Sequence, residues 1–382
     1  MTPPTSGGLG APPAGGGEHS DRAGSLVSTA VDWSFAADVG AKLSRPGPAT
    51  TDYTRDQAIA QLYESARIAE LPVREVTHLN EGAEVPEARV IDRKQWVRAA
   101  TRSMRVMTGG AEPTSKGRAG ALTAKVTGAQ TGGVLAFISS GILGQYDPFA
   151  SAGGPERSDS GDQPRGELLL VYPNVIAVER QLRVKPADFR LWVCLHEVTH
   201  RVQFRANPWL AEHMSSALSV LTDDGGEQVG DIVGRLGAYV RAQRSGTPVD
   251  ANSSGVLGLL RAVQAEPQRA ALDRLLVLGT LLEGHAEHVM DAVGPAVVPT
   301  VATIRRRFDE RRQRKQPPLQ RIIRTLLGFD AKLNQYTRGK VFVDDVVARV
   351  GMDRFNVIWT DAGTLPRPEE IEEPQRWIDR VL

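Results

Sequence analysis

The sequence predicts a mainly α-helical protein with a small β-sheet, an α+β fold. Apolar residues recur at helical spacing along most of the chain, whereas only residues 167–173, ELLLVYP, read clearly as a strand. The chain has 382 residues, 41% of them hydrophobic, which is enough for one large domain or two. We expect a disordered Gly/Pro-rich tail over 1–25, an N-terminal helical region over 26–107 and a third region over 108–382.

Two amphipathic helices begin the ordered part of the chain. Their apolar residues repeat over 31–43 and 55–70, on either side of the turn-rich segment RPGPATTD. A loop that contains Pro72 follows the second helix. A third helix is expected over about 92–107.

The middle of the chain carries weaker helix signals. Residues 108–132, rich in Gly, Thr and Ala, are either a mobile loop or the start of a helix that runs to about Gly144. The segment LGQYDPF, residues 143–149, reads as a compact turn. The strand over 167–173 is either an interior strand of a small sheet or an edge that binds a substrate backbone in extended form.

Helices are again predicted over the second half of the chain. A buried helix is expected over 275–294, where Gly294-Pro295 stops it. The basic run 305–315, RRRFDERRQRK, is interrupted by acidic residues and lacks an aromatic ladder, so it reads as a solvated helix face rather than a nucleic-acid surface. The other helices are expected over 209–221, 228–243, 255–265, 319–327 and 330–350.

The most informative motif is H-E-x-x-H, formed by His196, Glu197 and His200 within LWVCLHEVTHRVQF, residues 191–204. Two histidines at i and i+4 lie one turn apart on one helix face, so both imidazoles can bind one metal ion. Glu197 projects beside that face and can accept a proton from a metal-bound water. Only seven histidines occur in the chain, which makes a chance match rare. The motif therefore predicts a zinc site with Glu197 as general base.

A catalytic zinc needs a third protein ligand besides an open position for water. The metzincin pattern would require a histidine six residues after His200, and that position is Ala206, so the pattern fails. Glu283 lies on the apolar face of a predicted helix, where an unpaired carboxylate is unfavourable. His213 is a second candidate, beyond the end of the motif's helix. Glu287, one turn after Glu283, could orient a ligand histidine through a hydrogen bond.

Around Glu283 the sequence EGHAE resembles the second motif, E-G-x-A, of the glutamate zincins. Over most of its length the chain more closely resembles an actinobacterial family of zincin-like metallopeptidases, whose members are often labelled as associated with biosynthesis of coenzyme F-420, a deazaflavin. The resemblance implies a zincin-like core with His196, His200 and Glu283 as zinc ligands and Glu197 as general base. It also implies a long helical insertion, 205–270, between the two ligand helices. The matching stretches are VDWSFAADVG, RVIDRKQWVRA, LGQYDPF, LLLVYPNV, HEVTHRVQF, EGHAEHVMDAVG and KLNQYTRGKVFVDDVVARVGMDRFNVIW.

These inferences predict a zinc-dependent metallopeptidase that cleaves peptide bonds with zinc-activated water. Two other functions stay open: a zinc amidohydrolase that acts on a small molecule in cofactor metabolism, and a zincin-like scaffold without catalytic activity. A narrow pocket around the zinc would favour the amidohydrolase, whereas an open groove along the strand over 167–173 would favour the peptidase. Tyr336, His285 and His288 are each candidates to stabilise the oxyanion that forms when water attacks the carbonyl.

Composition excludes several other kinds of partner. The net charge is +1, so no overall field attracts nucleic acid or an anionic membrane. No apolar stretch reaches the roughly eighteen residues that span a bilayer, and the N-terminus lacks the apolar segment of a signal peptide. The single cysteine, Cys194, excludes an internal disulfide framework and is predicted to pack in the core. We therefore expect a cytoplasmic protein with a peptide or small amide as substrate, in an oligomeric state that the sequence leaves open.

Overall fold

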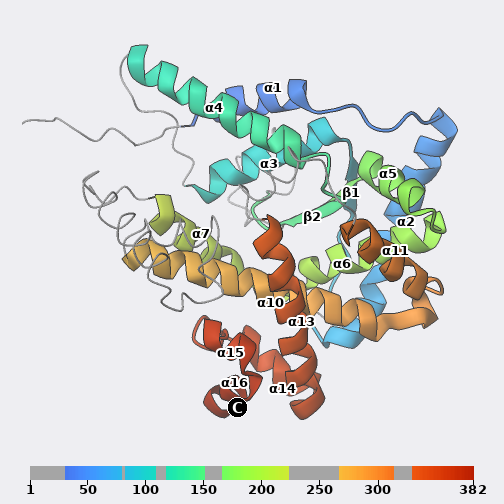
Figure 1. The fold of residues 1–382 in the computed structure, drawn as a ribbon, viewed down its shortest axis with the longest axis vertical. Coiled ribbons are helices and arrows are strands. Elements are labelled where there is room, and N and C mark those ends of the chain that lie inside the picture. The colour runs from blue at the N-terminus through green and yellow to red at the C-terminus, as the bar shows by residue number, and fades with distance from the viewer. Residues whose placement is uncertain (1–30, 80–81, 109–117, 151–165, 223–265, 314–328) are drawn as a thin grey trace, which may run out of the picture.

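The protein is mostly helical with one small three-stranded sheet, as the sequence predicted (Figure 1). The expected tail over 1–25 and most of the expected insertion over 205–270 lie outside the residues that the structure describes. The structure is a computed structural model, and it describes residues 31–79, 82–108, 118–150, 166–222, 266–313 and 329–382.

Two helices, α1 (Trp33–Leu43) and α2 (Asp52–Thr77), open the described chain, and the side chain of the residue before each one caps its first turn. α2 runs through Pro72, so the loop expected there is wrong. A proline inside a helix removes a backbone hydrogen bond, and this loss is offset by tertiary contacts. Glu70, two residues before the proline, accepts a buried hydrogen bond from Arg201 of a central helix.

The next two helices are α3 (Arg93–Met107) and α4 (Arg118–Ile138). The Gly-rich part of the sequence is therefore helical from residue 118 onward, which was one of the two interpretations. A Cβ on Gly132 would lie 2.5 Å from the carbonyl oxygen of Ala36 on α1, so only glycine lets the two helix backbones approach so closely. Glycine here serves close packing of helices rather than flexibility of the chain.

Three short strands form one sheet: β1 (Ala88–Ile91), β2 (Gly144–Asp147) and β3 (Glu167–Val171), in the order β1–β3–β2. β3 pairs with β1 in parallel and with β2 antiparallel, so it is an interior strand and the edge interpretation is wrong for it. The segment LGQYDPF is more than a turn, because it contains β2. Four residues give too little alternation for a sequence pattern to mark a strand, and β2 exists because β3 is there to pair with it.

The sheet separates two hydrophobic layers. Leu168 and Leu170 belong to the large core, whereas Leu169 and Val171 belong to a smaller cluster that includes side chains of α3 and α4. This division follows from the pleat of a strand, in which successive side chains point to opposite faces. β3 is therefore buried on both faces as well as along both edges.

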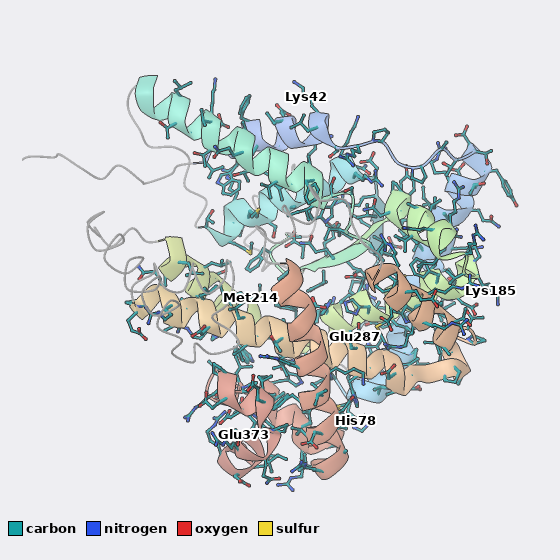
Figure 2. All side chains as sticks on the ribbon, viewed as in Figure 1. Lys42, His78, Lys185, Met214, Glu287 and Glu373 are labelled. Carbon is teal, nitrogen blue, oxygen red and sulfur yellow. The ribbon has the colours of Figure 1, made fainter. Side chains whose placement is uncertain are left out.

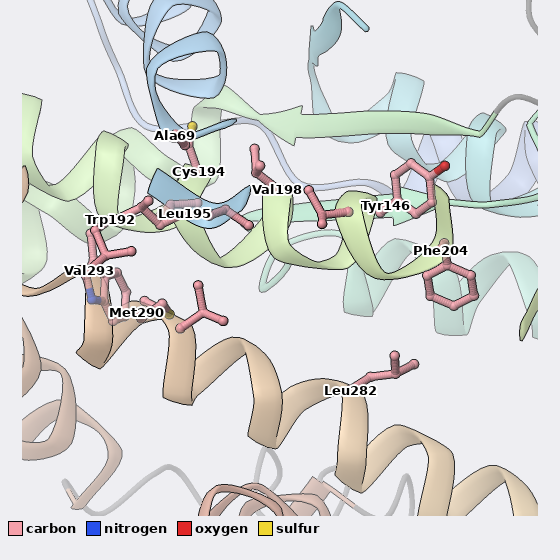
Figure 3. Close-up of a cluster of buried hydrophobic side chains, with 14 of the residues drawn as sticks. Ala69, Tyr146, Trp192, Cys194, Leu195, Val198, Phe204, Leu282, Met290 and Val293 are labelled. Carbon is pink, nitrogen blue, oxygen red and sulfur yellow. The ribbon is translucent and has the colours of Figure 1, made fainter. Parts of the chain in front are cut away.

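The large core is built around α6 (Pro186–Ala206), to which the short helix α5 (Tyr172–Leu182) leads from the end of β3. Figure 3 shows α6 between the sheet and the long helix α10 (Glu266–Val297), with Leu195 and Val198 among its buried side chains. Cys194 is also fully buried on α6, as predicted.

The described part of the second half is helical. α10 bends at Gly294, whose φ of 61° is left-handed, at the position where the sequence predicted a stop. α13 (Phe329–Val350) crosses α10, and the C-terminal helices return to the end of α2, where Nδ1 of His78 lies 2.5 Å from Oδ1 of Asp353 (Figures 1 and 2).

The helices expected over 228–243, 255–265 and 319–327 lie outside the described residues. The other helices are α7 (Trp209–Thr222), α11 (Val301–Gln313), α14 (Met352–Phe355), η3 (Asn356–Trp359), α15 (Pro368–Glu372) and α16 (Pro374–Val381).

Candidate metal centre

α6 presents the H-E-x-x-H motif on a helix that is buried along most of its length. Leu195 and Val198 fix its rotation, because both pack in the close-packed core. His196 and His200 lie one turn apart, as the spacing predicted, and their Nε2 atoms are 3.2 Å from each other. The two imidazoles therefore point toward one common position.

The third side chain of the cluster comes from α10. Oε2 of Glu283 lies 3.3 Å from Nε2 of His196 and 3.8 Å from Nε2 of His200. The fold thus joins residues that are about eighty positions apart in the sequence. In the described part of the chain, these three form the one group of His, Cys, Asp or Glu side chains whose ligand atoms converge as a metal ion would require.

The three ligand atoms fit a tetrahedral zinc ion. Zinc bonds of about 2.0–2.1 Å place neighbouring ligand atoms roughly 3.3–3.4 Å apart at a tetrahedral angle. The separations of 3.2, 3.3 and 3.8 Å are close to that spacing. Two imidazoles and one carboxylate are also a donor set of catalytic zinc sites, which keep a fourth position for water or substrate.

The electrostatics of the cluster favour a cation. Burial alone would lower the pKa of His196, but the hydrogen bond and the negative charge of Glu283, together with the charges of Glu197 and Glu287, outweigh it and raise this pKa to about 9. The negative potential that holds a proton on this imidazole attracts a divalent metal ion equally well. Glu283 and Glu197 beside the two histidines therefore suit a metal site, with the smallest contribution from the more distant charge of Glu287.

A residue that the sequence analysis did not single out, Gln203, orients His200. Its Oε1 lies 2.9 Å from Nδ1 of His200, while its Nε2 donates to the carbonyl oxygen of Leu282 at 3.0 Å and lies 2.9 Å from Nδ1 of His285. Both amide hydrogens of Gln203 are used in the bonds to Leu282 and His285, so it is the amide oxygen that faces His200 and accepts. His200 therefore donates from Nδ1, which leaves the lone pair of its Nε2 for a metal. The signal was present in the sequence as H-x-x-Q, since residues three positions apart share a helix face.

His285, one of the three candidates for the oxyanion, belongs to the core. It is fully buried and its ring lies 5.5 Å from that of Phe355 and 5.4 Å from that of Trp359, between centroids. Burial lowers its pKa to about 3, so the ring is neutral and its Nδ1 accepts the hydrogen bond from Gln203. His285 thus supports the group that orients His200.

The other two oxyanion candidates are placed differently. Nδ1 of His288 lies 2.7 Å from Oδ1 of Asp344 on α13, which fixes this imidazole between α10 and α13. Tyr336 lies on α13, and its side chain is outside the described part of the structure. Of the three candidates, His285 is thus placed in the core, while the oxyanion role of His288 or Tyr336 stays a prediction.

Two further candidates from the sequence do not join the cluster. His213 packs edge-on against Trp209, both on α7, with ring centroids 5.7 Å apart. Glu287, labelled in Figure 2, hydrogen-bonds to Arg305 of α11 at 3.0 Å rather than to a histidine, so its expected role is wrong. A nearby arginine competes better than a neutral imidazole for a carboxylate, and Gln203 takes the orienting role instead.

Glu197 lies against β2 and is buried, with 8% of its surface exposed. A Cβ on Gly144, the first residue of β2, would lie 2.6 Å from Cγ of Glu197 and 3.1 Å from its Oε1. Glycine at this position therefore leaves the space that the carboxylate occupies. Sequence reasoning missed Gly144 because it did not predict the strand to which this residue belongs.

A close helix crossing fixes the backbone at Glu283. A Cβ on the next residue, Gly284, would lie 2.1 Å from the carbonyl carbon of Gly339 on α13, and a Cβ on Gly339 would lie 2.1 Å from the carbonyl oxygen of Thr280. The glycine of the E-G-x-A motif thus permits α13 to touch α10 one residue from the ligand, and Ala286 is fully buried.

The fold and the cluster define a protein of the zincin class, with two histidines on one helix and a glutamate on a second. The chain belongs to the zincin-like metallopeptidase family, whose model matches residues 31–378. It is also similar to a protein from Chloroflexus aurantiacus, whose crystal structure is described as that of a proposed hydrolase with a novel fold. The TM-score is 0.61 and the identity 28%, over 92% of this chain and 98% of the other.

Among curated proteins, no sequence matches the chain significantly. In the described part of the structure, none of the helices combines the length and the apolar character that crossing a membrane requires.

Proposed function

We propose that the protein is a zinc-dependent peptidase with His196, His200 and Glu283 as ligands and Glu197 as general base. The observation that carries the proposal is the convergence of three ligand atoms within 4.8 Å of one another, with a second carboxylate, that of the buried Glu197, beside them. A structural zinc would take four protein ligands and would have no use for the extra carboxylate. Membership of the zincin-like family supports the same chemistry.

Each side chain has a separate task in this proposal. Zinc, when bound, supplies a Lewis acid that lowers the pKa of a water molecule and polarises a carbonyl group. Gln203 holds the ring of His200 in the tautomer that a ligand needs. Glu197 accepts the proton of the attacking water on a carboxylate oxygen and then donates it to the leaving nitrogen. Burial beside Gly144 keeps this carboxylate in place.

The sheet edge at β2 favours an extended peptide over a small amide. β3 is interior, so a groove along residues 167–173 is excluded as a substrate site. Within the described residues β2 pairs on one side only, with β3, and its first residue, Gly144, touches Glu197. A peptide added to β2 as a further strand would therefore pass the general base, with main-chain hydrogen bonds as its source of affinity.

The test compares three variants of the full-length protein loaded with zinc, assayed on a peptide library by mass spectrometry. Glu197→Gln should retain zinc and lose about two to four powers of ten in rate, because only the proton acceptor is removed. His200→Ala should lose both zinc and activity. Glu212→Gln, on an exposed position of α7, is the matched control and should leave both unchanged.

The outcomes separate the three candidate functions. Zinc binding without cleavage of any peptide would contradict the peptidase and favour a scaffold. Cleavage of small amides alone, again dependent on Glu197, would replace the peptidase with an amidohydrolase. Equal loss of zinc in Glu197→Gln and His200→Ala would show that Glu197 is not the base.

A further inference from the structure

A second site is formed at the edge of the sheet where the parallel strands β1 and β3 end. A pocket of about 350 Å³ lies there, lined by Asp92, Arg93 and Lys94 at the start of α3, by residues 172–173 at the start of α5, and by the loop between α1 and α2. None of its lining residues belongs to the metal cluster. The volume is in the range of small-molecule sites.

The position of the pocket in the fold favours an anion. β1 and β3 are adjacent and parallel, and each runs directly into a helix, so the N-termini of α3 and α5 open on the same side of the sheet. The crevice at the carboxyl ends of parallel strands is where α/β sheets bind ligands, and free backbone N–H groups at helix N-termini favour phosphate. The N-terminus of α3 is already capped by the carboxylate of Asp92 together with Gln95, so the N–H groups that could meet an anion are those of α5, which has no side-chain cap but whose Pro173 carries no N–H.

A buried cation at the pocket wall provides an independent indication of an anionic ligand. Arg93 is only 9% exposed, and it donates from Nε to Asn174 at 2.6 Å and from Nη1 to the carbonyl oxygens of Arg45 and Pro46 at 3.1 and 2.7 Å. These acceptors are all neutral, and within the described residues no carboxylate pairs with Arg93. Buried charges are normally paired, because neutral acceptors do not compensate the loss of hydration fully.

Two more cations at the rim reinforce the positive potential. Arg45 and Lys94 are exposed side chains that line the pocket, and neither forms an ion pair within the described residues. Arg55, also in the lining, is different because Asp52 and Asp56 already neutralise it. Asp92 adds one negative charge to the lining, so Arg45, Arg93 and Lys94 together leave a net positive charge for a ligand.

The wall of the pocket is held in shape without a ligand. The bonds from Arg93 tie the loop between α1 and α2 to α3, and Arg180 of α5 donates to the carbonyl oxygen of Ala49 in the same loop at 2.9 Å. Pro173 and Ile176 add an apolar surface beside the cations. The cavity thus combines a cationic rim with an apolar wall, the usual pattern of a small-molecule site.

We propose that this pocket binds the phosphate group of a small molecule, beside Arg45, Arg93 and Lys94 and in front of the N-terminus of α5. The site is separate from the metal centre, and the proposal does not depend on peptidase activity. The probe is pyrophosphate, added to the full-length protein at constant ionic strength and followed by isothermal titration calorimetry.

The wild-type protein should bind pyrophosphate saturably. The double variant Arg45→Gln/Lys94→Gln changes two exposed side chains, so it should fold normally and weaken binding by about tenfold or more. The double variant Arg98→Gln/Lys125→Gln removes the same charge from exposed positions outside the pocket, and it should bind like the wild type. His200→Ala should also bind like the wild type, because the metal centre is not involved.

Three results would overturn the proposal. The first is no saturable binding by the wild type in the millimolar range. The second is loss of binding in His200→Ala with retention in Arg45→Gln/Lys94→Gln, which would place the anion on the metal centre. The third is tighter binding of citrate than of pyrophosphate at the same residues, which would assign a carboxylate ligand in place of a phosphate.

Discussion

Replacing Gln203 with methionine should separate the orienting role of this residue from its contribution to stability. Methionine keeps the length of the side chain and removes all three hydrogen bonds, to His200, Leu282 and His285. Each buried group left without a partner costs about 1–3 kcal/mol, so the metal-free protein should lose on the order of 3 kcal/mol or more. Zinc affinity should fall by about tenfold to hundredfold, or roughly 1.4–2.8 kcal/mol, because the His200 ring loses its orienting partner.

The matched control is Gln203→Glu. A carboxylate retains the acceptor for Nδ1 of His200 but cannot donate to Leu282 or His285, so it should lose stability while binding zinc about as tightly as the wild type. Zinc affinity is measured by competition with a chromophoric chelator, and stability by urea unfolding of the metal-free protein. If folded Gln203→Met binds zinc as well as the wild type, the orienting role is refuted. If both variants lose the same affinity, the effect belongs to the fold alone.

Three further predictions concern the same region. Gly144→Ala should displace the carboxylate of Glu197 and reduce kcat/KM by about a hundredfold while zinc is retained. A kcat/KM equal to that of the wild type would contradict the close packing of Gly144 against Glu197. Gly339→Ala should lower the unfolding free energy by about 1–3 kcal/mol or more, because the methyl group meets backbone of α10. Gly279→Ala, also on α10 but with nothing within 4 Å of its Cβ, should stabilise by about 0.5–1 kcal/mol in the same urea titration. The pKa of His196 is raised to about 9, so this ring is protonated at neutral pH in the metal-free protein and must lose its proton to bind zinc. Zinc affinity should therefore rise about tenfold per pH unit and level off near pH 9. A flat affinity profile between neutrality and pH 9 would refute the raised pKa.

The features that the sequence predicted are those fixed by local geometry. The i, i+4 spacing of His196 and His200 determines that the two imidazoles share a helix face, whatever surrounds the helix. The stripe of apolar residues around Glu283 likewise predicts a buried helix, and a carboxylate on that stripe needs a cation. Gln203 was predictable by the same rule and was overlooked, since it stands three residues after His200.

The features that the sequence did not predict depend on a distant partner. β2 is a strand because β3 pairs with it, and the space beside Gly144 acquires meaning only when Glu197 is placed there. Helix α2 continues through Pro72 because tertiary contacts outweigh the local preference. Glu287 fulfils the spacing rule for an orienting carboxylate, yet Arg305 of another helix binds it instead.

The long separation between His200 and Glu283 does not loosen the site, because the contacts that place Glu283 are local to it. The preceding carbonyl, of Leu282, accepts a hydrogen bond from Gln203 on the helix of the other two ligands. The following residue, Gly284, touches the backbone of α13 so closely that no side chain fits between. These contacts lie entirely outside residues 223–265, so the position of the third ligand does not depend on that segment alone. The glycine after the glutamate therefore helps to position the metal site, since a methyl group there would push α10 away from α13 and carry the ligand with it.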